Sequence, residues 1–560
     1  MSGCATPRGA PVGPSPEAVA DRDPDASAYG QFLAGQAAVN HGESAAAEVY
    51  FDRAATLEPG ADRDLLVSRT FSSALLAGDI TQAAAAAPTG PDSDSAMRHL
   101  GALVRGVEAL SSGKARQARA ILTGPDSGAP NEPAAALLTP FAAAAAGDSD
   151  ASIVQPVIKG EPIAQFFANL DQGMLFERAR RYDEAETAFR ALIAKGDPGG
   201  IASLNLGEML ERRGRAADAV AIYDSAIAAK KGEARLVAAR DRAAGHKAPP
   251  PMPALRTSAA EALIAPATAL LIDKQDEIAL AYLRLALRLD PTRDEAWMLV
   301  GDVLASGHDA AGARAAYMRL RPAADQYVAA RAKLAWSYQD AKDKDAALAT
   351  ARETAALKPE DQDAAVTLAD LLRADERYAE SAEVLDRLIA ARPDSPDWKL
   401  LYMRAVDLQE SGHSLEAERD LQAALKQQPD EAQLLNFLGY TWIDRGVRLP
   451  EALAMVQRAV NLEPQSGAII DSLGWGYYRM GAYALAVEKL EAAVVLEPGD
   501  PDVNNHLGDA YWRVDRKTEA AFQWRRVLTL DPPDKLKAEA EAKLANGLDP
   551  APAAPVIAVR

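Results

Sequence analysis

The strongest constraint on the fold of this chain is a proline that recurs about every 34 residues in its C-terminal half. Successive members of the series lie 34, 36, 35, 34 and 34 residues apart: Pro359, Pro393, Pro429, Pro464, Pro498 and Pro532. Proline ends a helix because it lacks an N–H group and restricts the residue before it. In a chain rich in Ala and Leu, this period predicts stacked pairs of helices. Such a stack suits 560 residues, which are too many for one compact core.

Positions inside the period repeat as well. Leu438-Gly439, Leu473-Gly474 and Leu507-Gly508 recur 35 and 34 residues apart, and Ala520 to Trp524 supplies an A-x3-aromatic step. This pattern is similar to the tetratricopeptide repeat (TPR), which reads W-x2-L-G-x2-Y, then A-x3-F, then P. We therefore predict an all-α fold, a TPR superhelical solenoid of antiparallel helix pairs.

Composition and repeat quality divide the chain into five predicted parts. Gly35, Ala47 and Phe51 mark one repeat in the degenerate first half, where loops are expected at 88–95, 123–133 and 147–152. A Pro-rich run cannot lie inside a helix and predicts a joint. The parts are a disordered tether (1–26), a TPR-like helical solenoid (27–247), the joint (248–254), a C-terminal TPR solenoid (255–548) and a disordered tail (549–560).

The N-terminus contains the single cysteine, Cys4, which excludes an internal disulfide or a thiolate metal cluster. Met1-Ser2-Gly3-Cys4-Ala5 resembles the end of a bacterial lipobox, and the Pro- and Gly-rich residues 5–26 suit a tether behind a lipid anchor. The apolar region that precedes a lipobox is not in this sequence. Two interpretations stay open: Cys4 is lipidated in a longer precursor, or a disordered tail happens to contain a cysteine.

Charge and motifs give no indication of catalysis. The net charge of −19 argues against nucleic acid and anionic lipid as partners. We find no run of about 18 apolar residues and so expect no transmembrane helix. The histidines show no metal-binding spacing, and no nucleophile elbow, P-loop or C-x-x-C motif occurs. We predict no catalytic residues, no metal, no cofactor and no enzymatic activity.

The predicted working surface is the concave groove that the first helix of each repeat lines in a TPR superhelix. Aromatic and Arg side chains, which dominate binding hot spots, gather at its groove positions in the last three repeats. The candidates are Asn436, Tyr440, Asp444, Asp471, Trp475, Tyr478, Arg479, Asn505, Asp509, Trp512 and Arg513.

The tryptophans of this stretch divide into two groups. Trp442 and Trp524 fall at core positions between repeats, whereas Trp475 and Trp512 fit the groove or the core equally well. A groove of this kind binds an extended segment or a helix of another protein. A eukaryotic-type clamp for a C-terminal carboxylate is disfavoured, because Asp471 and Asp509 occupy positions that such a clamp fills with amide or basic side chains.

Residues 436–498 and 504–532 resemble the C-terminal repeats of bacterial TPR lipoproteins of the outer membrane. The resemblance implies a periplasmic, lipid-anchored adaptor that recruits a carboxyl-terminal processing protease and its cell-wall hydrolase substrates. A cytoplasmic location is the alternative, since this sequence contains no export signal.

Two further functions compete with the adaptor. Similar solenoids are scaffolds of envelope polysaccharide or protein secretion complexes. An enzyme with a helical binding domain would need a catalytic domain, and only residues 61–160 lack clear repeats. The sequence leaves the partner and the oligomeric state open.

Overall fold

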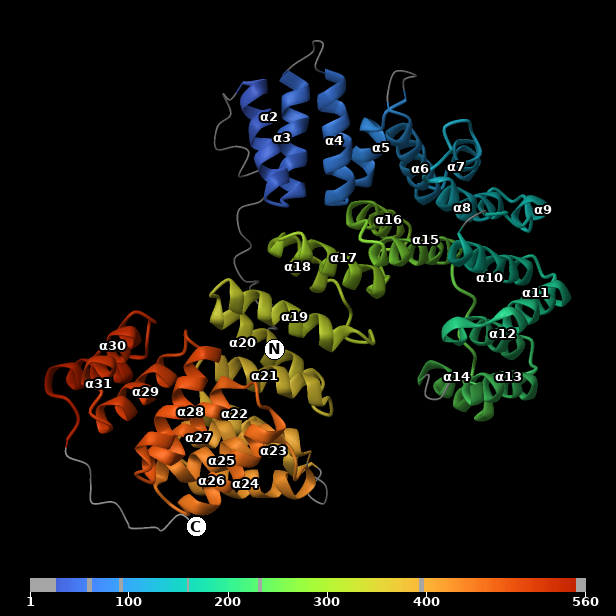
Figure 1. Ribbon diagram of the computed structural model, residues 1–560. Helices are drawn as coiled ribbons and strands as arrows, with labels where there is room; N and C mark the ends of the chain where they lie inside the picture. The colour runs from blue at the N-terminus through green and yellow to red at the C-terminus, as the bar shows by residue number, and fades with distance from the viewer. Residues whose placement is uncertain are drawn as a thin grey trace, which may run out of the picture. The chain divides into compact units, whose positions relative to one another are not determined.

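The structure is a computed structural model that describes residues 27–57, 63–89, 94–158, 161–229, 234–391 and 397–549. Cys4, the predicted tether and nearly all of the predicted tail lie outside these residues. Every described element of regular structure is a helix, which confirms the all-α prediction (Figure 1). The chain divides into two compact units, residues 1–337 and 338–560, and each is described by itself.

The first unit consists of paired helices from α2 onward, and α19 crosses its boundary. Its elements are α2 (Ala28–Asn40), α3 (Ser44–Leu57), α4 (Arg63–Ala77), α5 (Ile80–Ala86), α6 (Ser95–Ser111), α7 (Ala115–Leu122), α8 (Glu132–Ala145), α9 (Ser149–Ser152), α10 (Pro162–Arg178), α11 (Tyr182–Lys195), η1 (Pro198–Gly200), α12 (Ile201–Arg212), α13 (Ala216–Ala229), α14 (Ala234–Ala244), α15 (Leu255–Ile272), α16 (Asp276–Leu289), α17 (Asp294–Ser306), α18 (Ala310–Tyr317) and α19 (Tyr327–Asp340).

The second unit begins with the single helix α20, continues as a regular succession of helix pairs and ends with the single helix α31. Its elements are α20 (Lys344–Leu357), α21 (Gln362–Ala374), α22 (Tyr378–Ala390), α23 (Trp398–Glu410), α24 (Ser414–Gln427), α25 (Ala432–Arg445), α26 (Leu449–Leu462), α27 (Gly467–Arg479), α28 (Tyr483–Leu496), α29 (Pro501–Arg513), α30 (Lys517–Leu528) and α31 (Asp534–Asn546).

The repeated glycine permits the two helices of a pair to approach closely. A Cβ atom built on Gly207 would lie 2.3 Å from the Tyr223 ring, and one on Gly508 would lie 2.5 Å from the Trp524 ring. Each aromatic ring follows its glycine by 16 residues and is fully buried. The Gly-aromatic spacing in the sequence therefore records the contact that holds each pair together.

The recurring prolines end the second helices as the sequence predicts. Helices α20, α24, α26 and α28 each end two residues before the proline of the series. The next first helix then begins within a few residues, often with a side-chain cap. Asp361, for example, accepts a hydrogen bond from the backbone N–H of Ala364 at 3.1 Å.

The hairpin of α15 and α16 returns to pack against helices far earlier in the sequence. Helix α16 contacts α4, α5 and α6, and α15 contacts α8 and α10. Arg284 Nε donates to the carbonyl of Leu76 at 3.0 Å, and the Tyr282 hydroxyl donates to Asn131 Oδ1 at 2.9 Å. These contacts make the hairpin part of the first unit.

The predicted joint at 248–254 consequently lies inside the first unit, and the division falls instead between Ser337 and Tyr338. Arg212 donates to the carbonyl of Pro250 at 3.2 Å, and Arg178 donates to that of Pro253. The Pro-rich residues are not helical, as predicted, but the packing of α15 beyond them joins the two sides.

One expected loop contains a short helix. Residues 147–152 were expected to form a loop, whereas Ser149–Ser152 form one helical turn. The side chain of Asp148 caps this turn by accepting from the N–H of Ala151 at 3.0 Å, and Arg119 holds the same carboxylate. A local capping hydrogen bond therefore favours the turn over an open loop.

The expectation of no membrane-spanning segment needs a qualification. Helix α15 (Leu255–Ile272) is long and apolar enough to cross a membrane by length and composition, and 39% of it is buried inside the protein. Its contacts with α8, α10 and α16 are those of a solenoid core helix. Since core helices pass the same test, α15 is weak support for a membrane span.

Candidate functional site: the first-helix face of the last repeats

The first helices α25, α27 and α29 lie next to one another in the second unit. Each contacts the next directly. One face is therefore formed by side chains of three consecutive first helices, and we call it the first-helix face. The candidate residues predicted from the sequence all lie on these three helices.

A stack of three aromatic rings crosses from α27 to α29 on this face. The ring of Trp475 lies 4.2 Å from that of His506 and 4.7 Å from that of Tyr478, with interplanar angles of 16° and 8°. Trp475 and Tyr478 remain half-buried, whereas His506 is buried. Stacking on both sides fixes the indole ring in one orientation.

His506, the buried ring of the stack, also pairs with a buried carboxylate. Its Nδ1 lies 2.9 Å from Asp471 Oδ2, and both side chains are only 9% exposed. Burial acts to lower the pKa of His506, but the negative charges of Asp471, Asp509 and Asp502 outweigh it and raise the pKa. The imidazolium form is therefore favoured in the folded protein.

Two polar atoms of the first-helix face are buried without a hydrogen-bond partner in the structure. They are Oδ1 of Asn436 on α25 and Nε1 of Trp475 on α27. One is an acceptor and the other a donor, and they belong to neighbouring helices. Each such atom costs free energy in the folded protein, which calls for an explanation.

The α25 side of the face is acidic. Burial raises the pKa of the Tyr440 hydroxyl, and the charges of Asp444, Asp471 and Asp502 raise it further. Arg479 closes this side: it donates to the carbonyl of Asp444 at 2.7 Å, and its guanidinium group lies 6.0 Å from the Trp475 ring.

The predicted residues on α29 are engaged by the last helix, α31. Lys543 of α31 lies 2.8 Å from Asp509 Oδ2 and donates to Asn505 Oδ1 at 2.9 Å. The same Asp509 accepts from the indole N–H of Trp524 at 3.0 Å. Asn505 and Asp509 are buried by these contacts.

Trp512 and Arg513 are covered in the same way. A Cβ atom on Gly547 would lie 2.1 Å from the Trp512 ring, so this glycine permits the chain after α31 to cross the indole closely. Arg513 donates to the carbonyl of Asp549 at 2.6 Å and to the hydroxyl of Tyr478 at 3.2 Å. Trp512 therefore packs at the end of the solenoid, while Trp475 remains on the open part of the face.

The structure thus divides the eleven predicted residues. Those on α25 and α27 form one neighbourhood around Trp475, and those on α29 form contacts within the protein. Trp442 and Trp524 are buried core residues, as predicted, with exposures of 4% and 0%. His506 and Lys543 were not predicted, because neither occupies a groove position of the repeat pattern.

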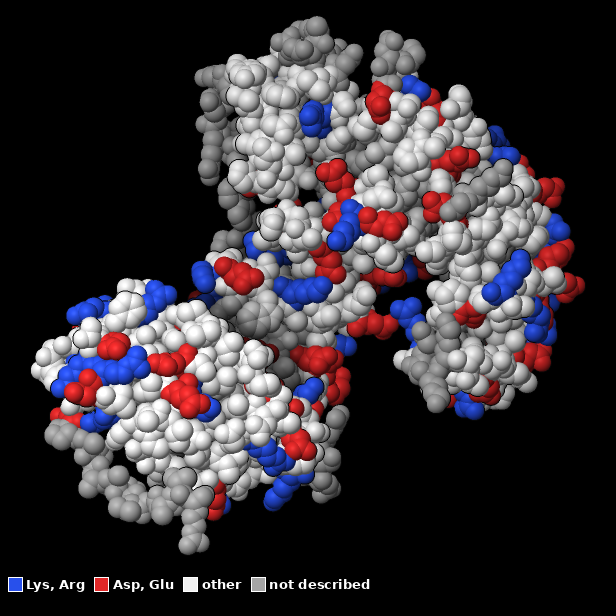
Figure 2. All heavy atoms as spheres, viewed as in Figure 1, with Lys and Arg blue, Asp and Glu red and all other residues white. Residues whose placement is uncertain are grey.

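Charged side chains of both signs are scattered over the face of the molecule that Figure 2 shows. On the face that Figure 2 shows, the coloured basic and acidic side chains are interspersed and form no continuous basic stripe. Among the described residues, no group of three or more His, Cys, Asp and Glu side chains is placed to hold a metal ion.

Comparison with known proteins identifies the repeats. The sequence model of the tetratricopeptide repeat family matches residues 170–234, 332–396, 402–468 and 472–535. The TPR repeat-containing protein PA4667 of Pseudomonas aeruginosa is 39% identical over 97 residues, which are 17% of this chain and only 16% of that protein.

Solved structures of similar fold are helical repeat proteins of low sequence identity. A tetratricopeptide repeat protein from Parabacteroides merdae is 15% identical, with a TM-score of 0.40 over 45% of this chain and 99% of that one. The APC/C hetero-tetramer Cut9-Hcn1 is 14% identical, with a TM-score of 0.37 over 96% and 98%. The chain therefore contains tetratricopeptide repeats in the matched residues, and its helix pairs form a TPR solenoid fold.

Proposed function

We propose that this protein is a non-enzymatic scaffold that binds a segment of another protein on the open part of its first-helix face. TPR repeats in general suggest protein–protein interaction. The observation that carries the proposal is the pair of unpartnered polar atoms, Asn436 Oδ1 and Trp475 Nε1, beside a fixed aromatic stack. Leaving a buried polar atom unpaired costs about 1–3 kcal/mol.

A peptide backbone can form hydrogen bonds with both of these atoms. An extended segment offers N–H donors and C=O acceptors in alternation. After a small movement of the side chains, its N–H would donate to Asn436 and its C=O would accept from Trp475. The ring faces of Trp475 and Tyr478 supply the apolar contact area that anchors a partner side chain.

The finer proposal is a periplasmic adaptor anchored to the outer membrane through Cys4. It recruits a carboxyl-terminal processing protease and its cell-wall hydrolase substrates. The support is the sequence resemblance of residues 436–498 and 504–532 to bacterial outer-membrane TPR lipoproteins, since this block contains α25, α27 and α29. Cys4 supplies the residue that such an anchor needs.

The test is cross-linking capture from the source bacterium with the full-length precursor, comparing wild type with an Asn436→Ala, Trp475→Phe double variant. We expect the wild type to capture a periplasmic protease, and the double variant to lose at least about tenfold of it. Trp336→Phe is the matched control, because Trp336 is an exposed tryptophan of the first unit. Equal capture by the double variant would contradict the role of this face.

The anchor and the kind of partner are tested separately. Membrane attachment that is unchanged by Cys4→Ala would exclude lipidation as the anchor. Capture of envelope assembly components in place of a protease would favour a scaffold of a polysaccharide or protein secretion complex. Turnover that maps to residues 61–160 would contradict the non-enzymatic assignment.

A further inference from the structure

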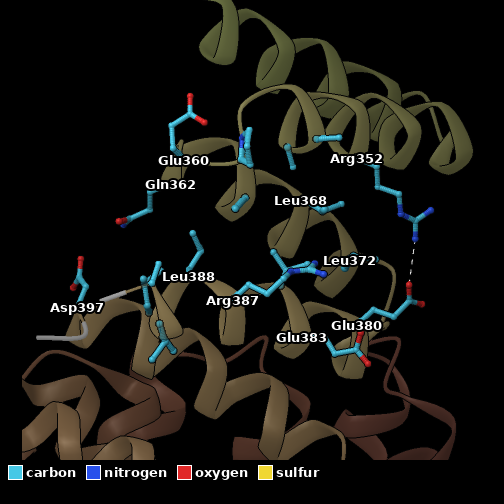
Figure 3. Close-up of a pocket in the computed structure, with 18 residues that line it drawn as sticks. Arg352, Glu360, Gln362, Leu368, Leu372, Glu380, Glu383, Arg387, Leu388 and Asp397 are labelled. Atoms are coloured by element: carbon cyan, nitrogen blue, oxygen red, sulfur yellow. Dashed lines mark hydrogen bonds and ion pairs between the residues drawn. The ribbon is translucent and has the colours of Figure 1, made fainter. Parts of the chain in front are cut away.

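A hollow lies between the second helices α20 and α22, away from the first-helix face. Helix α21 forms its floor, where Leu368 and Leu372 are 7% and 2% exposed. The hollow encloses about 570 Å³. Figure 3 shows Leu368, Leu372 and Leu388 along its middle, with Arg387 beside them, and the other labelled charged residues toward its ends. We call it the α20–α22 groove.

The groove exists because two side chains are smaller here than in the other repeats. Ala355 is the twelfth residue after the cap of α20, where α24, α26 and α28 carry Leu425, Val460 and Val494. These three larger residues pack against the cores between their repeats.

On the floor of the groove, too, a side chain is smaller than its counterparts in other repeats. Ala365 is the fourth residue after the cap of α21, where α23, α25 and α27 carry Leu401, Leu435 and Ile470. Both alanines line the groove. The apolar volume that fills the gap between neighbouring repeats elsewhere is therefore missing between α20 and α22.

The two ends of the groove differ in charge. At one end Arg352 lies 3.2 Å from Glu380, which Arg377 also binds, so this end is neutralised (Figure 3). At the other end lie Glu360 and Asp397, which form no ion pair with any described residue. The groove thus has an apolar floor, Arg387 on its α22 wall and an acidic end.

The walls select the conformation of an occupant. The backbone groups of α20, α21 and α22 are used within the helices, so the groove offers few partners to the N–H and C=O groups of an extended chain. A helix satisfies its own backbone hydrogen bonds. The residues of α22 and its C-cap that line the groove run from Glu380 to Ala391, a length of about 16 Å or three helical turns.

We propose that the α20–α22 groove is a docking site for an amphipathic helix of a partner protein. The helix places a large apolar side chain over Ala355 and Ala365, and Lys or Arg residues near its end pair with Glu360 and Asp397. This surface is separate from the first-helix face, so the scaffold holds two partner segments at two distinct places on the second unit.

The probe is a synthetic alanine-based helical peptide of about 16 residues with Leu at i, i+3 and i+7 and two Lys residues at one end. Its binding to the full chain is followed by fluorescence anisotropy. Ala355→Leu with Ala365→Leu fills the groove and is expected to weaken binding at least about tenfold. Ala379→Leu, at an exposed position of α22 outside the groove, is the matched control and leaves binding unchanged.

A second variant keeps the volume of the groove and alters only its charge. Glu360→Gln with Asp397→Asn, where an amide oxygen can still cap α23, is expected to weaken the Lys peptide several-fold and to reduce its advantage over a peptide with Glu in place of the two Lys residues. Circular dichroism verifies that each variant is folded. Trp475→Phe leaves binding of this peptide unchanged, which keeps the result independent of the first-helix face.

Three outcomes would overturn the proposal. They are binding as tight to the filled groove as to the wild type, equal binding of the Lys and Glu peptides, and equal binding of a peptide with a central Pro that cannot remain helical. The last result would assign the groove to an extended segment.

Discussion

The two units treat the same kind of surface in opposite ways. In the first unit, the first helices α4, α6 and α8 contact the returning hairpin of α15 and α16. In the second unit, α31 binds the last first helix, α29, while Trp475 and Tyr478 of α27 remain half-buried. A face of first helices is therefore a core surface in one unit and a candidate binding surface in the other.

Both units contain paired polar groups and buried polar atoms without a partner. In the first unit, Arg288 pairs with Glu108 at 2.8 Å, and Tyr282 pairs with Asn131. Thr70 Oγ1 on α4 is buried without a partner in the first unit, and Asn436 Oδ1 and Trp475 Nε1 are in the second, where they lie on the first-helix face with the aromatic stack. Polar groups that are paired within the protein stabilise packing, whereas unpaired ones next to an aromatic surface favour binding of another chain.

The largest effect is expected from Leu283→Asp, which would break the closed state of the first unit. Leu283 is fully buried in α16, so the carboxylate would cost about 5 kcal/mol or more. Hydrogen–deuterium exchange should rise in α4, α6, α8 and the hairpin. Exchange that rises only in the hairpin would show that the hairpin does not support these helices.

Lys543→Ala is expected to destabilise the end of the second unit by about 3 kcal/mol, because it leaves the buried Asp509 without its cation. The loss of α31 should expose Trp512, which is measured as a red shift of tryptophan emission at low urea. Lys537→Ala is the control, since Lys537 is an exposed lysine of the same helix. An unchanged spectrum would mean that α31 is held mainly by apolar contacts.

Trp475→Phe should separate stability from binding. Replacing the indole removes an unsatisfied donor, so we expect the free energy of unfolding to stay equal or to rise by up to about 1 kcal/mol. Partner capture should fall at the same time. A clear loss of stability, measured by urea unfolding, would show that Trp475 is a core residue like Trp442.

The smallest effect is a pH dependence of the last repeats. The pKa of His506 is raised in the folded protein. Its contribution to the free energy of unfolding is therefore complete below its ordinary pKa of about 6.5 and is lost as pH rises through the pKa of the folded state. The raised pKa values of Asp502 and Asp509 act in the same direction, and the lowered pKa of Glu539 acts against them.

Urea midpoints between pH 5.5 and 8.5 measure this dependence. His506→Gln should flatten the decline with rising pH, whereas His413→Gln, in an exposed turn, should leave it as it is. A midpoint that rises with pH in the wild type would contradict the favoured imidazolium.

Prediction from the sequence succeeded where a contact joins neighbours in the chain. Gly508 and Trp524 are 16 residues apart, and the same contact recurs in other repeats, as between Gly207 and Tyr223, so periodicity reveals it. The core positions of Trp442 and Trp524 follow from the same pattern. The placement of Trp475 does not, since the repeat pattern fits groove and core equally well at that position.

Contacts between residues far apart in the chain could not be predicted from the sequence. Arg284 binds the carbonyl of Leu76, which is 208 residues away, and nothing in the repeat pattern links the two. The same holds for Lys543, which reaches Asp509 and decides which predicted residues stay open.

The sequence by itself determined the helix pairs, their period, their glycine–aromatic cores and the prolines that end them, because these depend on local propensity and on contacts between adjacent repeats. Only the tertiary structure decided that α15 and α16 close the first unit and that α31 covers α29. It also decided that Trp475 stays at the surface of the second. Those outcomes depend on which helices far apart in the chain bury one another, and no periodic pattern encodes that choice.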